Sequence, residues 1–133
     1  MIERIRRHSI RWFAIALIGA GLVSFPAGVA AKGTEVIRTG SCTGASDWKL
    51  KAKPDNGRLE IEFEVDQNVN NRTWNVKLKK NGNVFWRGQR TTQAPSGSFS
   101  VTKFTANPAG TDTIVGRAVN PATGEVCKGS LTI

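Results

Sequence analysis

The chain has 133 residues, with 19 lysines and arginines against 10 acidic residues and a formal net charge of +9. This length suits one small domain, and the basic balance favours contact with anionic partners. The sequence holds a single histidine, His8, and no tyrosine, which excludes histidine-rich metal sites and most histidine-based catalysis.

The first 31 residues have the layout of a cleavable signal peptide. A basic start precedes an uncharged apolar stretch over residues 12–23. That stretch falls short of the roughly 20 apolar residues that span a bilayer, which disfavours the alternative of an uncut membrane anchor. Pro26 then breaks the helix, and small residues before Lys32 form a cleavage site. We expect an exported protein whose mature domain is residues 32–133, with no membrane span after signal removal and with either the general or the twin-arginine route open.

Export changes what the charge and the cysteines mean. Residues 1–31 account for +3 of the +9, which leaves +6 for residues 32–133. Both cysteines, Cys42 and Cys127, lie in the mature part, and an even count in an exported chain predicts a disulfide. The bridge would tie the first β segment to the last. A catalytic thiol is the alternative, but the mature part offers no histidine to activate it.

Apolar and polar side chains alternate with a period of two along the mature part, which predicts an all-β domain. The alternation is clearest over residues 59–65, where large apolar side chains are separated by glutamates. We expect β segments at residues 35–43, 48–52, 59–65, 74–78, 84–91, 99–105, 113–119 and 126–132. Phe99, Val101 and Phe104 are assigned to the core.

Charge pairing indicates a register for the hairpin around residues 54–57. Placing Trp48 opposite Phe63 gathers the apolar side chains on one face and sets Lys51 against Glu60 on the other. A slip by one residue would turn every side chain to the wrong face. We therefore expect the lysines of this strand to be solvated and paired with glutamates, in preference to a docking site for polyanions.

The connection after the third β segment leaves two topologies open. In a meander, residues 74–78 pair with residues 59–65 and Lys77 meets Glu62. In the other topology the chain crosses to a second sheet, and Trp74 packs onto the first sheet from the opposite side. Sequential strands often neighbour each other, which favours the meander. The resemblance described next leads us to prefer the crossing.

From residue 58 onward the pattern resembles an immunoglobulin or fibronectin type III sandwich. The matching positions are residues 59–65 for the second strand, Trp74 for the buried tryptophan of the third, residues 80–83 for the turn after it, residues 110–114 for the approach to the sixth strand and residues 125–132 for the last. The resemblance implies an immunoglobulin-like antiparallel β-sandwich of seven or eight strands. The corner tyrosine and the disulfide between the second and sixth strands are absent. The layout is also similar to uncharacterised secreted proteins of actinobacteria, a resemblance that implies no particular activity.

Asn81 and Gly82 predict a tight hairpin turn, because both central residues of a type I′ turn need positive φ. Pairing Leu78 with Phe85 across this turn points Trp86 outward. In the alternative arrangement a bulge turns Trp86 inward and Phe85 outward, or Trp86 only shields a sheet edge. The sequence leaves both arrangements open.

A crossing topology would leave the outer face of the second sheet without a glutamate strand beside it. That face would present the candidate ligand-binding residues Lys77, Lys79, Trp86 and Arg117. An exposed tryptophan flanked by cations can stack on a sugar ring or engage an acidic polymer. The expected partners are therefore an anionic cell-envelope polymer, a carbohydrate or another protein. Nucleic acid is not expected, because no recognition motif for it occurs.

Catalytic and cofactor motifs are lacking, so we expect no enzyme, no catalytic residue and no cofactor. The loop after residue 65 begins like a calcium loop at Asp66, but Asn71 and Lys77 stand where an EF-hand has glycine and glutamate. An Asx turn is favoured instead, with no metal site. The expected function is a secreted non-catalytic binding or interaction module. The alternatives are a secreted inhibitor or structural surface protein acting through a loop, and a minor hydrolase.

Overall fold

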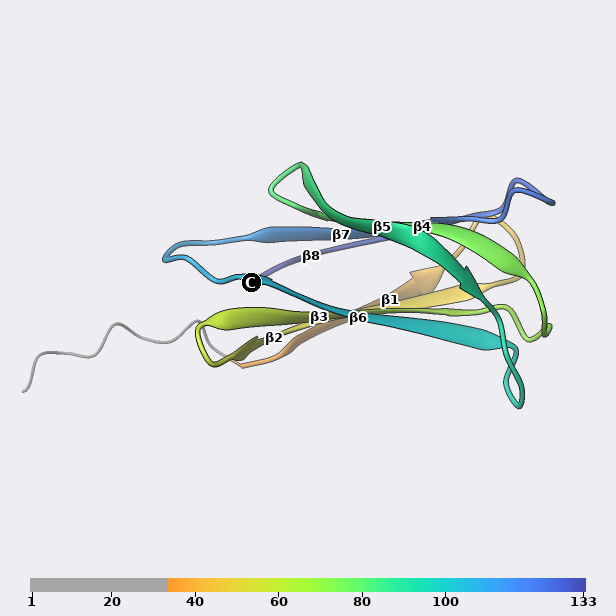
Figure 1. Cartoon of the computed structure of the whole chain (residues 1–133), viewed down its shortest axis with the longest axis horizontal. Coiled ribbons are helices and arrows are strands. Elements are labelled where there is room, and N and C mark those ends of the chain that lie inside the picture. The colour runs from red at the N-terminus through yellow and green to blue at the C-terminus, as the bar shows by residue number, and fades with distance from the viewer. Residues whose placement is uncertain (1–33) are drawn as a thin grey trace, which may run out of the picture.

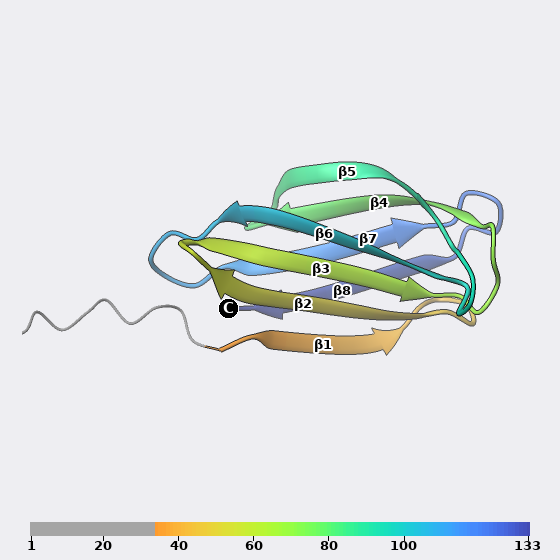
Figure 2. The ribbon, with the colours of Figure 1, turned by 60° about the horizontal axis from the view of Figure 1, so that its bottom comes forward.

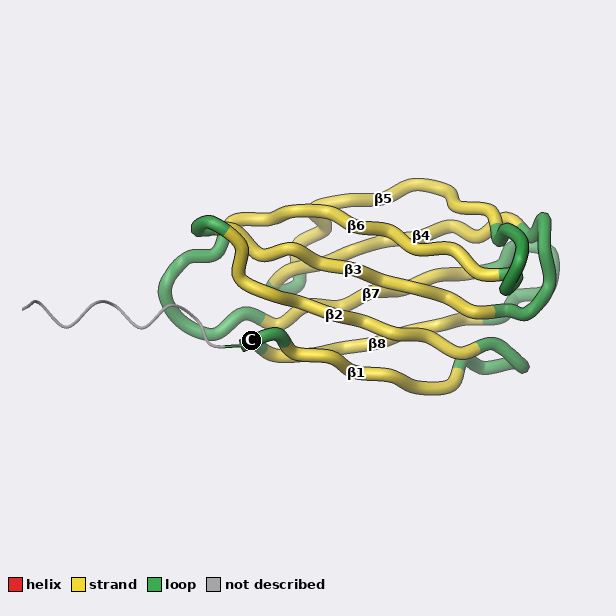
Figure 3. The backbone as a smooth tube through the Cα atoms, turned by 90° about the horizontal axis from the view of Figure 1, so that it is seen from below, coloured by secondary structure: helices red, strands yellow, loops and turns green. Residues whose placement is uncertain are grey.

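The computed structural model describes residues 34–133 as two β-sheets stacked face to face (Figure 1). The strands are β1 (Val36–Ser41), β2 (Asp47–Asp55), β3 (Arg58–Asp66), β4 (Thr73–Lys80), β5 (Asn83–Thr91), β6 (Ser98–Ala106), β7 (Thr113–Val119) and β8 (Val126–Thr132). Figure 3 shows strands joined by loops at the two ends of the sandwich. The all-β prediction is confirmed. The described part contains no helix able to cross a bilayer, and the predicted signal peptide, residues 1–31, lies outside the described residues.

Strand order decides between the two topologies. One sheet has the order β1-β2-β3-β6 and the other β5-β4-β7-β8, with every pair antiparallel (Figure 2). The consecutive strands β3 and β4 lie in opposite sheets, so the crossing prediction is confirmed and the meander is wrong. The loop between β3 and β4 therefore carries the chain from one layer to the other.

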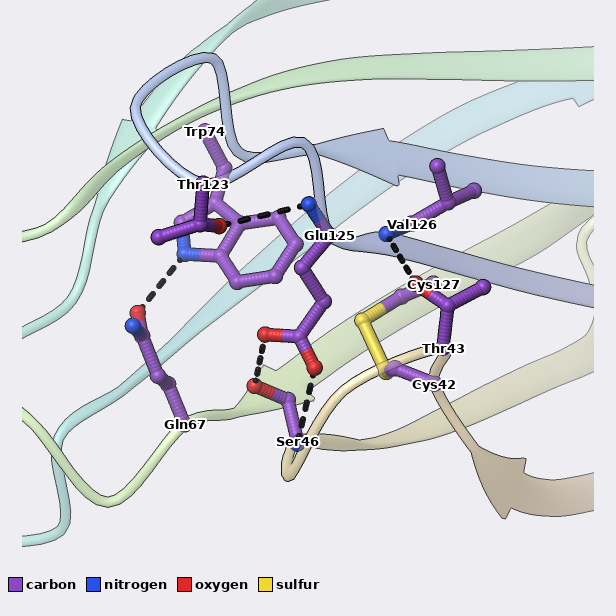
Figure 4. The surroundings of a disulfide bond; sticks show 9 residues. All are labelled: Cys42, Thr43, Ser46, Gln67, Trp74, Thr123, Glu125, Val126 and Cys127. Atoms are coloured by element: carbon purple, nitrogen blue, oxygen red, sulfur yellow. Dashed lines mark hydrogen bonds between the residues drawn. A yellow bond between two sulfur atoms is a disulfide. The ribbon is translucent and has the colours of Figure 1, made fainter.

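The core fills the space between the sheets with the inward side of each alternation. Its fully enclosed side chains include Leu50, Leu59, Ile61, Phe63, Val65, Trp74, Leu78 and Ile114. Trp74 reaches across the core, with its ring centroid 6.3 Å from that of Phe99, and its Nε1–H donates to Gln67 Oε1 at 2.9 Å (Figure 4). This bond satisfies the one polar atom of the indole, so the largest buried side chain leaves no unpaired donor.

One core assignment from the sequence is wrong. Phe99 and Val101 are buried, but Phe104 is 43% exposed. Alternation along β6 puts Phe99, Val101 and position 103 on the inner side, so Phe104 points outward. There the guanidinium carbon of Arg58 lies 4.2 Å from the Phe104 ring centroid. Arg58 therefore covers part of the Phe104 ring, which lies outside the core.

The β2–β3 hairpin has the predicted faces but a different register. Trp48 lies opposite Val65 and not opposite Phe63, which faces Leu50 instead. The reason is a tighter turn than expected: Asn56 (φ 49°) and Gly57 (φ 77°) make it alone, so pairing continues to the strand ends. A shift by two residues keeps every side chain on its face. It changes only the partners across the hairpin.

The β4–β5 hairpin contains both the predicted turn and an irregularity. Asn81 and Gly82 adopt positive φ of 50° and 82°, as a type I′ turn requires. A β-bulge then interrupts the register between Leu78 and Lys79, so Leu78 faces Trp86 and not Phe85. Because a bulge adds one residue to one strand, it reverses the alternation beyond it. Every side chain of β5 after Phe85 is turned to the opposite face from the one that simple alternation predicts.

The predicted disulfide between Cys42 and Cys127 is confirmed and closes one side of the sandwich (Figure 4). It links the loop after β1 to β8, across a sequence separation of 85 residues. Hydrogen bonds surround it: Glu125 accepts from the backbone N–H and the hydroxyl of Ser46 at 3.0 and 2.8 Å, and the Val126 N–H donates to the Thr43 hydroxyl. Covalent and polar contacts together fix the two loops at this end.

Candidate functional site

Four cations form one row across the outer face of the sheet β5-β4-β7-β8. Arg87 of β5 lies opposite Lys77 of β4, Lys77 lies opposite Arg117 of β7, and Arg117 lies opposite Lys128 of β8. We call these four residues the cationic row. Adjacent strands are about 4.8 Å apart, so the row spans roughly 14 Å of sheet. Lys79 lies on the same face, two residues from Lys77 along β4.

Carboxylates are missing from this face in the part of the chain that the structure describes. The side chains that share it are Thr73, Asn75, Lys77, Lys79, Val84, Arg87, Gln89, Thr91, Thr113, Val115, Arg117, Val119, Val126, Lys128, Ser130 and Thr132. Within residues 34–133, no member of the cationic row forms an ion pair or a side-chain hydrogen bond. Among the described residues, the four charges therefore have no carboxylate partner.

Shallow hollows lie on both sides of the row. One, of about 450 Å³, is lined by Asn75, Gln89 and Val119 together with row residues. The other, of about 430 Å³, is lined by Lys79, Val115 and Gly82 together with row residues. Lys77 and Arg117 line both hollows, so the middle of the row forms the ridge between them.

The opposite outer face of the sandwich carries lysines of a different kind. Lys49, Lys51 and Lys53 of β2 face Glu64, Glu62 and Glu60 of β3, respectively. The closest ion pair joins Lys51 Nζ and Glu62 Oε2 at 3.0 Å. The hydrogen bond to Glu62 and the negative charges of Glu62, Glu35 and Glu60 raise the pKa of Lys51, although burial acts to lower it. The expected pairing of this lysine stripe with glutamates is confirmed, and each of its three lysines lies opposite a glutamate.

Three of the four predicted ligand-binding residues come together and the fourth does not. Lys77, Lys79 and Arg117 share the outer face as expected. Trp86 is turned inward by the bulge, because it lies opposite the buried Leu78 and packs half-buried against the core. The hypothesis of an outward Trp86 is therefore wrong. The alternative arrangement is right about Trp86, whereas Phe85 stays half-buried against the core.

Trp86 closes the side of the sandwich between β5 and β6. The Arg90 guanidinium carbon lies 4.8 Å from the ring centroid, and Lys103 Nζ of the other sheet lies 5.1 Å from it. Gly88 makes room for the ring, since a Cβ there would lie 2.6 Å from Trp86 Cζ2. Arg90 from one sheet and Lys103 from the other lie against the ring, so Trp86 serves to close this edge of the sandwich.

Sequence reasoning missed two members of the row, Arg87 and Lys128. Lys128 had a usable signal: a bridged Cys127 must point inward, so its neighbour on the strand must point outward. Arg87 had none, because its outward direction depends on the bulge near Phe85. The row as a whole also requires the strand order β5-β4-β7-β8, which brings distant segments side by side.

The calcium-loop candidate is an ordinary turn. Asp66 Oδ1 accepts a hydrogen bond from the Asn68 N–H at 3.1 Å, which makes an Asx turn, and both Asn68 and Asn71 adopt positive φ. Across residues 34–133, no three His, Cys, Asp or Glu side chains gather as metal ligands. The loop serves the crossing between the sheets.

These features define a class of protein: a disulfide-closed β-sandwich with one cationic outer face and one outer face whose lysines are paired with glutamates. Comparison of the chain with family models, curated proteins and solved structures finds no match. The likeness to immunoglobulin and fibronectin type III domains therefore stays a prediction, and function has to be argued from the surface itself.

Proposed function

We propose that this protein is an exported, non-catalytic binding module whose cationic sheet face binds an anionic polymer of the cell envelope. The observation that carries the proposal is the cationic row, with four unpaired cations in register on a face without carboxylates. The signal-like N-terminus and the disulfide support export, because disulfides persist in oxidising compartments.

The contrast between the two outer faces supports a binding role for one of them. Like charges placed directly opposite each other destabilise a sheet, whereas opposite charges stabilise it. The three central lysines of β2 follow that rule, with Lys51 beside Glu62, although Asp47 lies opposite Asp66 at the end of the strand pair. The other sheet breaks it, with Lys77 between Arg87 and Arg117. A local cost to stability with no structural return is expected where a surface is kept for an anionic partner.

The composition of the face favours a solvated polymer over a protein. Protein interfaces are enriched in aromatic side chains and depleted in lysine at their centre. This face carries lysine at its centre, and its apolar side chains are four scattered valines. Because Trp86 is turned inward, its ring cannot stack on a neutral sugar bound at this face. Charge must carry recognition, so the partner must be anionic.

The test measures retention on defined polymers. Protein purified after export is applied at low salt to alginate, to poly(glycerol phosphate) and to neutral dextran. The double variant Lys77→Gln/Arg117→Gln removes the middle of the row, and the matched control Lys49→Gln/Lys53→Gln removes the same charge from the opposite outer face, where the lysines are paired with glutamates. A surface ion pair contributes about 0.2–1 kcal/mol, and the row variant loses two such contacts with the polymer. Its affinity for the anionic polymers should therefore fall roughly two- to 25-fold.

The outcomes separate a binding face from mere basicity. Equal losses in the row variant and the control would mean that net charge alone drives retention, and the proposal would be wrong. Stronger retention on an acidic protein or on duplex DNA than on either anionic polymer would replace the polymer with that partner. Trp86→Ala should leave retention unchanged, because the ring faces inward.

A further inference from the structure

The cationic row has a direction, and the direction limits how a chain can bind. Across the strands, four cations follow one another at the spacing of adjacent strands, about 4.8 Å. Along β7 and β8 the charge stops at once: Arg117 is flanked on its face by Val115 and Val119, and Lys128 by Val126 and Ser130. The positive potential of this face is therefore a band perpendicular to the strands.

Within residues 34–133, only one cation on the face lies outside this band. Lys79 lies two residues from Lys77 along β4, and its neighbours across the sheet are Val84 and Val115. A polymer that followed β4 would meet two cations, whereas one that crossed the strands would meet four. Each neutralised charge adds to the electrostatic affinity, so the crossing orientation is the stronger one.

Amide groups lie beside one half of the band. Gln89 Nε2 donates to Asn75 Oδ1 at 3.0 Å. Asn75 lies two residues from Lys77 along β4, and Gln89 lies two residues from Arg87 along β5. The amide oxygen of Gln89 and the amide NH2 of Asn75 are not used in this bond, and both residues are exposed beside the hollow that they line. Such groups bind hydroxyls, which a bare polyelectrolyte lacks.

We infer that the ligand is a linear, hydroxyl-bearing polyanion such as a polyuronate, laid across the strands with successive acid groups on Arg87, Lys77, Arg117 and Lys128 and its hydroxyls toward Asn75 and Gln89. The inference rests on the proposed function and specifies the ligand class and its orientation. A flat row without an enclosed pocket suits repeated weak contacts, whose sum gives the affinity.

The test compares the two ends of the row with the cation outside it. Affinities for alginate di-, tetra- and octasaccharides are measured for Arg87→Gln, Lys128→Gln and Lys79→Gln. Both end variants should lose roughly 1.4- to fivefold for the octasaccharide and little for the disaccharide, which the central pair can hold alone. Lys79→Gln should lower the affinity for the octasaccharide by less than either end variant does. Gln89→Leu should weaken alginate octasaccharide binding and leave polyacrylate of matched charge unaffected.

Each result either supports the inference or overturns it. A larger loss for Lys79→Gln than for both end variants would mean that the polymer follows β4, and the crossing orientation would be wrong while the proposed function survives. Equal effects of Gln89→Leu on alginate and polyacrylate would overturn the assignment of a hydroxyl-bearing ligand. Absence of binding by every anionic probe would instead refute the proposed function itself.

Discussion

Neutralising the centre of the cationic row should make the protein more stable. Lys77 has a like charge directly opposite on each side, Arg87 on β5 and Arg117 on β7. If each repulsion equals in size the attraction of an opposite-charge pair, about 0.2–1 kcal/mol, Lys77→Gln relieves about 0.4–2 kcal/mol at low salt. A gain of 1 kcal/mol raises the Tm of a domain of this size by about 4–8 °C.

Urea unfolding at two ionic strengths measures this effect. The Debye length is about 30 Å at 0.01 M salt and about 3 Å at 1 M, so the gain should be largest in the dilute buffer and nearly vanish in the concentrated one. Lys51→Gln is the control, because Lys51 lies on an internal strand of the other sheet beside Glu62. This variant should lower the free energy of unfolding by up to about 1 kcal/mol. The reasoning fails if Lys77→Gln destabilises the protein at low salt, or if its gain persists unchanged at 1 M.

Three further predictions concern the scaffold. Replacing both Cys42 and Cys127 by alanine should cost about 4.5 kcal/mol by the chain-entropy relation for an 85-residue separation, measured by urea unfolding, and a cost below 1 kcal/mol would contradict it. The raised pKa of Lys51 means that its ion pair with Glu62 stabilises the fold below the ordinary lysine pKa and is lost as pH rises through the folded value. The stability difference between wild type and Lys51→Met should therefore shrink above about pH 10.4, and a difference that grows there would refute the linkage. Gly116→Ala places a Cβ 2.8 Å from the phenylalanine ring beneath it and should cost about 1–3 kcal/mol by overpacking, whereas unchanged thermal melting would show that the ring can move aside.

Local sequence predicted much of the fold because alternation is a local property. The buried set of β3 and the paired glutamates on its other face follow directly from residues 59–65. The disulfide was predicted from an even cysteine count in a chain expected to be exported, without any knowledge of the topology. These predictions needed only the period of two and the chemistry of the compartment.

Errors arose where one residue changes the pattern. A turn made by Asn56 and Gly57 alone shifted the β2–β3 register by two residues, which altered the ion-pair partners but not the faces. The bulge beside Phe85 had the larger effect, because an odd insertion reverses the face. It removed Trp86 from the candidate site and brought Arg87 into it.

The sequence by itself determined the fold class, the faces of most strands, the disulfide and three cations of the candidate surface: Lys77, Lys79 and Arg117. The tertiary structure alone decided that β3 and β4 lie in opposite sheets, and that Arg87, Lys77, Arg117 and Lys128 stand in one row. The physical reason is range: the direction of a side chain follows from its own strand, whereas a row across strands depends on which distant segments pair and in what register.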